Sequence, residues 1–205
     1  ASTCGAIYSN GITTVTNSTF INTSASASGG AIYKLSNGGS LTVIDSTFIN
    51  TTAGDSGGAI YKSSTSNVTV IGSNFINTTS TGTGSNNGGG AIYITGGGNF
   101  NVTNSTFTNN TAGSKGASIY TRSVSNVKDS TFNSPNANGT AIIYISSSNK
   151  DVNLTNNSIT SNLLAIYNDG GNITSPTKLT FNNVAGVVGK NAALTASLTD
   201  DNGNL

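Results

Sequence analysis

Aspartates and one arginine are the residues of this 205-residue chain that could do acid–base chemistry, because it contains no Glu and no His. Asp45 and Asp129 occupy the same position of a repeated motif, in its second and fifth copies. If the copies stack about 4.8 Å apart, roughly 14 Å separates the two carboxylates. Glycosidases need a pair about 5 to 9.5 Å apart, and Arg122 is the only guanidinium for a lyase-type site. We therefore expect no catalytic residues and no enzymatic activity.

Metal and cofactor sites are also not expected. Asp200, Asn202 and Asn204 have the spacing that begins a calcium loop, but Leu205 stands where Gly is needed and no Glu closes the loop. A hairpin turn explains the same residues. The lone Cys4 has no His with which to form a nucleophilic pair.

Tyrosine marks an internal repeat. All seven tyrosines follow an Ile, at spacings between 23 and 32 residues. The seven copies are Ala6-Ile7-Tyr8, Ala31-Ile32-Tyr33, Ala59-Ile60-Tyr61, Ala91-Ile92-Tyr93, Ser118-Ile119-Tyr120, Ile142-Ile143-Tyr144 and Ala165-Ile166-Tyr167. Repeats of this length are typical of solenoids.

A second motif follows each of the first six tyrosines. Its copies are Asn17-Ser18-Thr19-Phe20, Asp45-Ser46-Thr47-Phe48, Gly72-Ser73-Asn74-Phe75, Asn104-Ser105-Thr106-Phe107, Asp129-Ser130-Thr131-Phe132 and Asn156-Asn157-Ser158-Ile159. The first position holds only Asn, Asp or Gly, which tolerate a left-handed backbone. We expect a tight bend there, flanked by an apolar residue two positions before it and another three positions after it.

These motifs predict an all-β, right-handed parallel β-helix of about seven coils with three strands each, over residues 1–175. Residues 176–205 no longer follow the repeat. Alternation of Ala192, Leu194, Ala196 and Leu198 indicates a strand, and we expect the truncated start of a second β domain there. A chain that starts without a signal peptide suggests a mature or excised segment of a longer protein.

The tyrosine row is the strongest candidate binding surface. If Ile points inward, alternation sends Tyr outward, and Tyr33, Tyr61, Tyr93, Tyr120 and Tyr144 form an exposed column with Lys34 and Lys62 beside it. Such a column could stack against sugar rings or another protein. The alternative is that Ala and Tyr point inward and Ile outward.

Isoleucines outside the tyrosine motif predict a contact patch. By the same alternation, Ile21, Ile49 and Ile76 face outward beside inward Phe, with Ile44 and Ile71 around the corner. Aligned exposed Ile usually marks contact with another chain or domain. A preceding segment of the same protein would cover it equally well.

Composition limits the partners. Gly, Asn, Ser and Thr make up 118 residues, and the net charge is +1, too weak for a nucleic-acid surface. No apolar run is long enough to insert into a membrane. Twelve N-glycosylation sequons occur against about nine expected from composition, and Asn50, Asn67, Asn77 and Asn101 are candidate acceptors.

The coil pattern resembles the adhesin-like surface proteins of methanogenic archaea, and more distantly the GGAI and FxxN repeats of chlamydial polymorphic membrane proteins. Gly29-Gly30-Ala31-Ile32, Gly57-Gly58-Ala59-Ile60 and Gly89-Gly90-Ala91-Ile92 carry the first motif, and Phe107-Thr108-Asn109-Asn110 carries the second. Phe-Ile-Asn replaces the second motif at Phe20, Phe48 and Phe75. The tail from Gly189 is similar to the start of bacterial-type immunoglobulin-like modules.

This resemblance implies an extracellular, cell-surface glycoprotein that acts as an adhesive or structural rod, with other surface proteins or glycans as partners. Two alternatives remain open. One is a β-helix that binds or degrades polysaccharide, and the other is a filament subunit that self-associates through its incomplete C-terminal strands.

Overall fold

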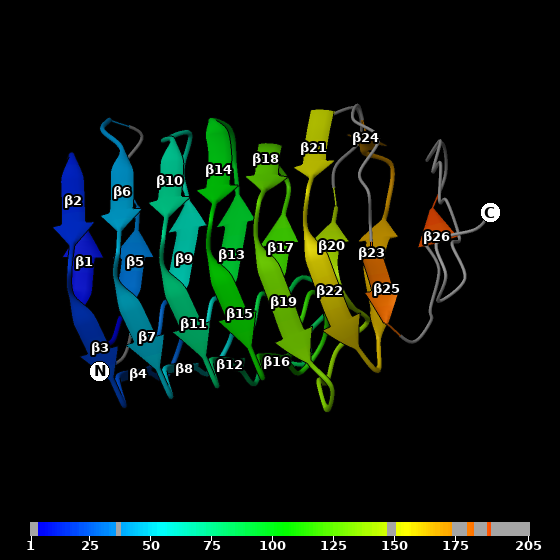
Figure 1. Ribbon diagram of the computed structural model, residues 1–205. Coiled ribbons are helices and arrows are strands. Elements are labelled where there is room, and N and C mark those ends of the chain that lie inside the picture. The colour runs from blue at the N-terminus through cyan, green and yellow to red at the C-terminus, as the bar shows by residue number, and fades with distance from the viewer. Residues whose placement is uncertain (1–3, 36–37, 147–150, 174–179, 183–187, 190–205) are drawn as a thin grey trace.

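The computed structural model describes residues 4–35, 38–146, 151–173, 180–182 and 188–189. These residues form an all-β parallel solenoid of about six turns, and they contain no helix. Figure 1 shows the coils side by side along a rod, with the chain running from one end of the rod to the other. The predicted parallel β-solenoid is confirmed.

Sheet A carries the Ile-Tyr motif and has eight parallel strands. They are β1 (Ile7–Ser9), β5 (Ile32–Lys34), β9 (Ile60–Ser63), β13 (Ile92–Thr95), β17 (Ile119–Thr121), β20 (Ala141–Ile145), β23 (Leu164–Asn168) and β26 (Val188–Gly189).

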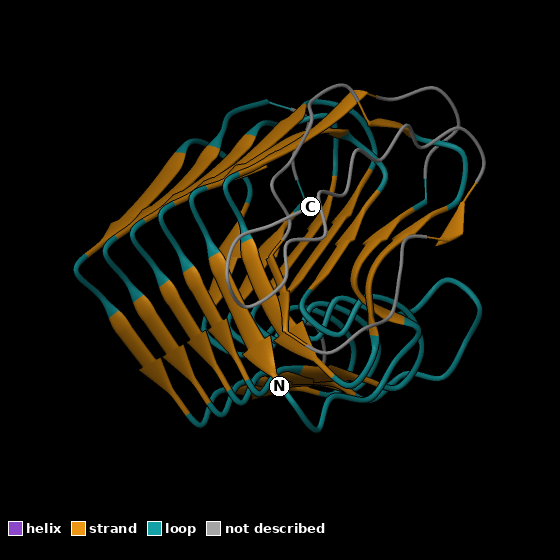
Figure 2. Ribbon diagram, turned by 45° about the vertical axis from the view of Figure 1, so that its right-hand side comes forward, coloured by secondary structure: helices purple, strands orange, loops and turns teal. Residues whose placement is uncertain are grey.

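Sheets B and C lie on either side of the predicted bend and have seven strands each. Sheet B contains β2 (Thr13–Thr16), β6 (Leu41–Ile44), β10 (Val68–Ile71), β14 (Asn99–Thr103), β18 (Val124–Lys128), β21 (Asp151–Thr155) and β24 (Asn172–Ile173). Sheet C contains β3 (Thr19–Ile21), β7 (Thr47–Ile49), β11 (Asn74–Ile76), β15 (Thr106–Thr108), β19 (Thr131–Ser134), β22 (Ser158–Ser161) and β25 (Thr180–Asn182). Figure 2 shows the three long sheets wrapped around a common interior.

A fourth sheet was not predicted from the sequence. Sheet D consists of four two-residue strands. They are β4 (Ser24–Ala25), β8 (Thr52–Ala53), β12 (Thr79–Ser80) and β16 (Thr111–Ala112). Three strands per coil is therefore an incomplete description of the first four coils.

The interior is built from rows of identical or similar residues. Ile32 pairs with Ile60, Val43 with Val70, and Phe48 with Phe75, so residues one repeat apart are vertical neighbours. The phenylalanine rings form one column with centroids 4.6 to 4.8 Å apart, and Phe48, Phe75, Phe107 and Phe132 are fully buried. Since each coil shares its apolar surface with two neighbours, short strands suffice to exclude water.

The bend between sheets B and C has the predicted left-handed backbone. Its first position has a φ of 47° at both Asn17 and Asp45, and 59° at Gly72. The next residue forms a ladder inside the corner that was not predicted from the sequence. The Ser73 hydroxyl accepts the Ser46 N–H at 3.1 Å and donates to the Ile71 carbonyl at 2.9 Å. The equivalent serines repeat these bonds in the neighbouring coils, so the corner is tied to the coil above and below.

The Gly-Gly pairs close each coil before sheet A. Gly57 adopts a φ of 67°, and a Cβ on Gly58 would lie 2.0 Å from the carbonyl oxygen of Gly90 in the next coil. The first glycine supplies the left-handed turn and the second allows two backbones to approach. This geometry explains why Gly-Gly precedes Ala-Ile in three successive coils.

Residues beyond 175 contribute two short described strands. β25 pairs in parallel with β22, and β26 with β23, so sheets C and A of the solenoid extend past residue 175, where a second β domain was expected to begin. The other residues of the expected immunoglobulin-like segment, including Ala192, Leu194, Asp200 and Asn202, lie outside the described part of the chain.

Candidate functional site: outward rows of the solenoid

The tyrosines form one continuous column on the outer face of sheet A. Ile32, Ile60 and Ile92 are in the main core, whereas the tyrosines form a separate cluster. Ile therefore points inward and Tyr to the other side of the sheet, as the first of the two alternatives predicted. Successive rings from Tyr8 to Tyr167 stack with centroids 4.4 to 5.5 Å apart.

The expected exposure of this column is wrong for its centre. Tyr93, Tyr120 and Tyr144 are only 5 %, 1 % and 3 % exposed, whereas Tyr8 is 49 % exposed. Tyr33 and Tyr61 are half-buried. Tyr167, at the other end of the column, is also half-buried, so the column is fully buried only between Tyr93 and Tyr144.

Residues from the loops preceding sheet A contact the buried tyrosines. The Tyr93 hydroxyl donates to the carbonyl of Asn86 at 2.6 Å, and the Lys115 ammonium lies 4.8 Å from the ring centroid of Tyr144. Burial, reinforced by neighbouring tyrosines, raises the pKa of Tyr93, and burial together with Asp169 raises that of Tyr144. These phenols stay protonated under ordinary conditions.

Ring geometry argues against sugar stacking along the column. Planes of neighbouring rings differ by 4° to 30°, so each ring from Tyr33 to Tyr144 has a tyrosine against both of its faces. A sugar stacks on an aromatic face, and those faces are occupied. The column presents ring edges and hydroxyls instead, and its main effect is to stabilise sheet A through stacked pairs.

Lys34 and Lys62 do not flank the tyrosines on the surface, which corrects the prediction. Both are fully buried, because alternation along β5 and β9 places them on the same side as the core isoleucines. Their Cα atoms are partners, yet Lys34 donates to the carbonyl of Gly11 in the first coil and Lys62 to that of Gly97 in the fourth. The two ammonium groups therefore point away from each other along the rod.

Burial shifts the protonation equilibrium of Lys34 and Lys62 toward the neutral amine. Loss of solvation lowers the pKa of Lys34 and lowers that of Lys62 from 10.5 to about 8. Among the described residues, neither lysine forms an ion pair. They are internal cations with carbonyl partners, and they cannot contact an external ligand.

The isoleucine rows lie on the outer faces of sheets B and C, which both face the viewer in Figure 1. Ile21, Ile49 and Ile76 are in register on sheet C. Ile21 is 56 % exposed, and the other two are half-buried. On sheet B, Ile71 is exposed and Ile44 half-buried. The outward orientation of both rows agrees with the alternation read from the sequence.

The candidate glycosylation residues occupy three different settings. Asn50 and Asn77 lie in an exposed ladder at a second left-handed corner, where Asn50 donates its amide to Asn22 at 3.2 Å and Asn77 to Asn50 at 3.3 Å. Asn67 is exposed and accepts the backbone N–H of Asn99, and Asn101 is half-buried on sheet B. The ladder provides a structural reason for the sequons at Asn50 and Asn77, since Asn adopts the left-handed corner and Thr52 or Thr79 begins the next strand.

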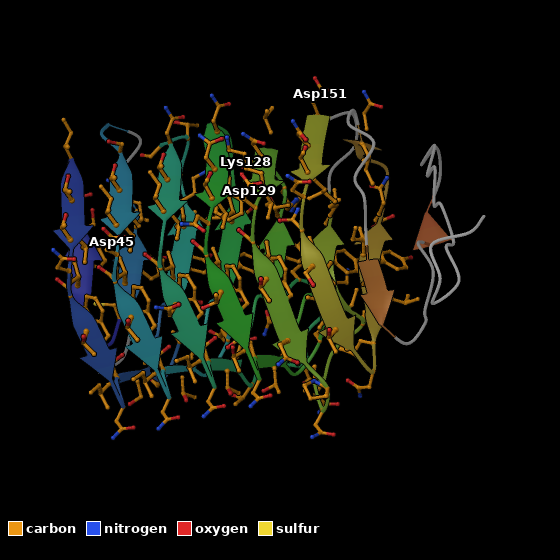
Figure 3. All side chains as sticks on the ribbon, viewed as in Figure 1. Asp45, Lys128, Asp129 and Asp151 are labelled. Atoms are coloured by element: carbon orange, nitrogen blue, oxygen red, sulfur yellow. The ribbon has the colours of Figure 1, made fainter. Side chains whose placement is uncertain are left out.

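The described acidic residues are dispersed. Asp45 and Asp129 occupy the same corner row, with Gly72 and Asn104 in the coils between them, and Figure 3 shows them well apart along the rod. Within the described ranges, no three Asp, Glu, His or Cys side chains cluster as potential metal ligands.

Threonines line one hollow at the end of sheet D. It has a volume of about 230 Å³ and is lined by Thr79, Ser80, Thr81, Thr111, Ala112, Gly113 and Asn138. The hydroxyls of Thr79 and Thr111 are 3.2 Å apart, and Asn138 is exposed. The lining carries no charge, so any ligand held there would be neutral and bound by hydrogen bonds.

The segments described here include no helix long and apolar enough to cross a membrane. No protein-family model, no curated protein and no solved structure matches the chain.

Proposed function

We propose that this protein is a non-enzymatic rod of an extracellular cell surface, which mediates adhesion or surface assembly through the outer faces of its coils. The observation that carries the proposal is the in-register row Ile21, Ile49 and Ile76, with Ile44 and Ile71 on the adjoining sheet. An apolar row on a surface otherwise rich in Thr, Ser and Asn marks a contact region. The likeness of the coils to archaeal adhesin-like proteins supports the same assignment.

The proposal includes finer features of the fold. The solenoid winds to the right, has about seven coils, and is followed, after the last described solenoid strand β26, by an immunoglobulin-like module that acts as a stalk. The handedness of parallel crossover connections supports the first feature. The seven copies of the tyrosine motif support the second.

Polysaccharide processing is the function most in need of a direct test, because a parallel solenoid offers a long face to an extended polymer. The purified chain is incubated with pectin-like and cell-wall polysaccharides, and reducing ends and unsaturated products are measured over time. We expect neither to rise above a heat-denatured control. A rise that Asp45→Asn or Asp129→Asn abolishes would overturn the non-enzymatic assignment.

Binding of a neutral glycan is a second candidate, favoured by the uncharged hollow at the end of sheet D. Its hydroxyl and amide groups could bond to sugar hydroxyls. Titration with neutral oligosaccharides, followed by NMR, should shift the signals of Thr79, Thr111 and Asn138, and Thr111→Val should weaken the shifts. Shifts elsewhere, or none, would exclude the hollow as a glycan site.

A further inference from the structure

The isoleucine strip, defined as Ile21, Ile49 and Ile76 on sheet C with Ile44 and Ile71 at its rim, occupies positions that tolerate polar residues. The sheet C row continues in register with Thr108 in the fourth coil, and then with Asn133 and Thr160. The sheet B row continues with Thr103, Lys128 and Thr155. Coil geometry therefore does not require Ile at these positions. Apolar side chains are concentrated on one half of the rod.

Exposed charged side chains are concentrated on the other half of the rod, away from the isoleucine strip. In the described residues up to Ile76 the charged side chains are Lys34, Asp45, Asp55 and Lys62, and both lysines are buried. Asp45 lies at the corner between the two rows, at the rim of the strip, and Asp55 lies beyond sheet D. The fifth to seventh coils expose Arg122, Lys128, Asp129, Asp151 and Asp169. The centre of the strip is thus uncharged, and the charged half of the rod lies beyond it.

We propose that the strip is covered by the same strip of a second copy of this chain, in a side-by-side dimer of rods. An uncharged row suits a two-fold contact, because the axis places it against itself with no like charges at the centre. The net charge of +1 adds little repulsion between copies. Isoleucine offers neither an aromatic face nor a hydrogen bond to a sugar, so protein fits this surface better than glycan.

Sheet packing gives the contact its geometry. Two sheet faces pack about 10 Å apart when their side chains interdigitate. In this arrangement Ile21, Ile49 and Ile76 of each copy fill the spaces between those of the other. Thr19 and Thr47, which share the outer face of sheet C with them, lie within the contact. The inference deepens the proposed rod by naming its partner, and rests on that function only in treating the strip as a contact surface.

The test measures the mass of the full chain by light scattering and sedimentation over a range of concentrations. We expect a concentration-dependent dimer. The triple variant Ile21→Thr, Ile49→Thr and Ile76→Thr, which extends the residue found at Thr108, should be monomeric at the same concentrations and melt within a few degrees of the unmodified chain. A chain that is monomeric at every concentration, or a dimer that survives the triple variant, overturns the proposal.

A charge-insertion pair keeps the test valid if the triple variant fails to fold. Thr19 and Thr131 are both exposed and belong to the same row of sheet C, one beside the strip and one in the polar half. Thr19→Arg should abolish the dimer and Thr131→Arg should leave it intact, and equal effects contradict the proposed surface. Mass measurements need no external ligand or substrate, so their outcome is independent of the polysaccharide assays.

Discussion

Replacing Lys62 by Met should stabilise the protein at neutral pH. The Lys62 side chain is fully buried, and burial lowers its pKa from 10.5 to about 8. At about 1.4 kcal/mol per pKa unit, keeping the ammonium charged inside the fold costs roughly 3 kcal/mol. Its register partner in the next coil is Ile94, which is also buried, so an apolar side chain suits this position.

A lost hydrogen bond offsets part of the gain. Lys62 donates to the carbonyl of Gly97, and leaving a buried acceptor unpaired costs about 1 to 3 kcal/mol. Burial of the Met side chain adds to the gain. We expect a net stabilisation of about 1 to 2 kcal/mol at pH 7, which for a chain of this size raises Tm by about 2 to 8 °C.

The pH dependence distinguishes this explanation from simple packing. A folded-state pKa below the unfolded value means that the unfolded chain binds more protons between about pH 8 and pH 10.5, so unmodified protein gains stability as pH rises through this window. The loss of stability caused by burying the Lys62 ammonium should fall to less than about 1 kcal/mol by pH 10. The advantage of Lys62→Met should shrink accordingly.

Thermal unfolding followed by circular dichroism at pH 7, 8.5 and 10 measures both effects. Lys128→Met is the matched control, because Lys128 is exposed on sheet B. The control should change stability by less than about 0.5 kcal/mol. The reasoning would be refuted if Lys62→Met were less stable than the unmodified chain at pH 7. It would also be refuted if the gain in stability were the same at all three pH values.

Three further substitutions test individual features of the coil. Ser73→Ala removes a hydroxyl that bonds both Ser46 and Ile71 inside the corner, so urea unfolding should show a loss of about 1 to 3 kcal/mol; a loss no larger than that of outward Thr69→Ala would contradict a role for the ladder. Gly58→Ala places a Cβ 2.0 Å from the Gly90 carbonyl oxygen and should cost about 3 kcal/mol or more, whereas Gly84→Ala, whose nearest atom is 3.5 Å away, should have little effect on the melting temperature. Tyr93→Phe removes the bond to Asn86, so limited proteolysis within residues 81–88 should accelerate while stability falls by only about 0.5 to 1.5 kcal/mol. Unchanged proteolysis relative to Tyr33→Phe would mean that this hydroxyl does not hold the loop.

The repeat made much of the fold predictable from sequence. Asn17 and Asp45 adopt the left-handed corner that their side chains favour, and Phe48 and Phe75 stack inside it. These features depend on backbone preference and apolar period, which are both local properties. Sheet D was missed because two-residue strands such as Thr52–Ala53 have no period of their own to detect.

Lysine burial could also have been predicted. Lys62 stands two residues after Ile60, and the same spacing at Ile92 and Ile94 indicated the inward side. Charge made the surface the expected location, but alternation along a strand determines direction regardless of side-chain type. The serine ladder had a comparable signal, since Ser follows the bend in five of the six copies of the second motif.

Burial of the tyrosine column could not have been predicted from the repeat. Contacts from Asn86 and Lys115 arise in the loops between the repeated motifs, where length and composition differ from coil to coil. A period predicts which residues share a row, but not which rows a neighbouring loop covers. For this reason the outward side of Tyr93 was predicted and its exposure was not.

A crystal structure of the chain tests most directly the claim that residues one repeat apart are vertical neighbours with fixed inward and outward sides. We predict that the Phe48, Phe75 and Phe107 rings stack in one internal column with centroids 4.8 Å apart, while Ile49 and Ile76 lie on the outer face of the same sheet. Phenylalanines dispersed among separate clusters, or isoleucines inside with phenylalanines outside, would contradict both the solenoid and the contact surface inferred from it.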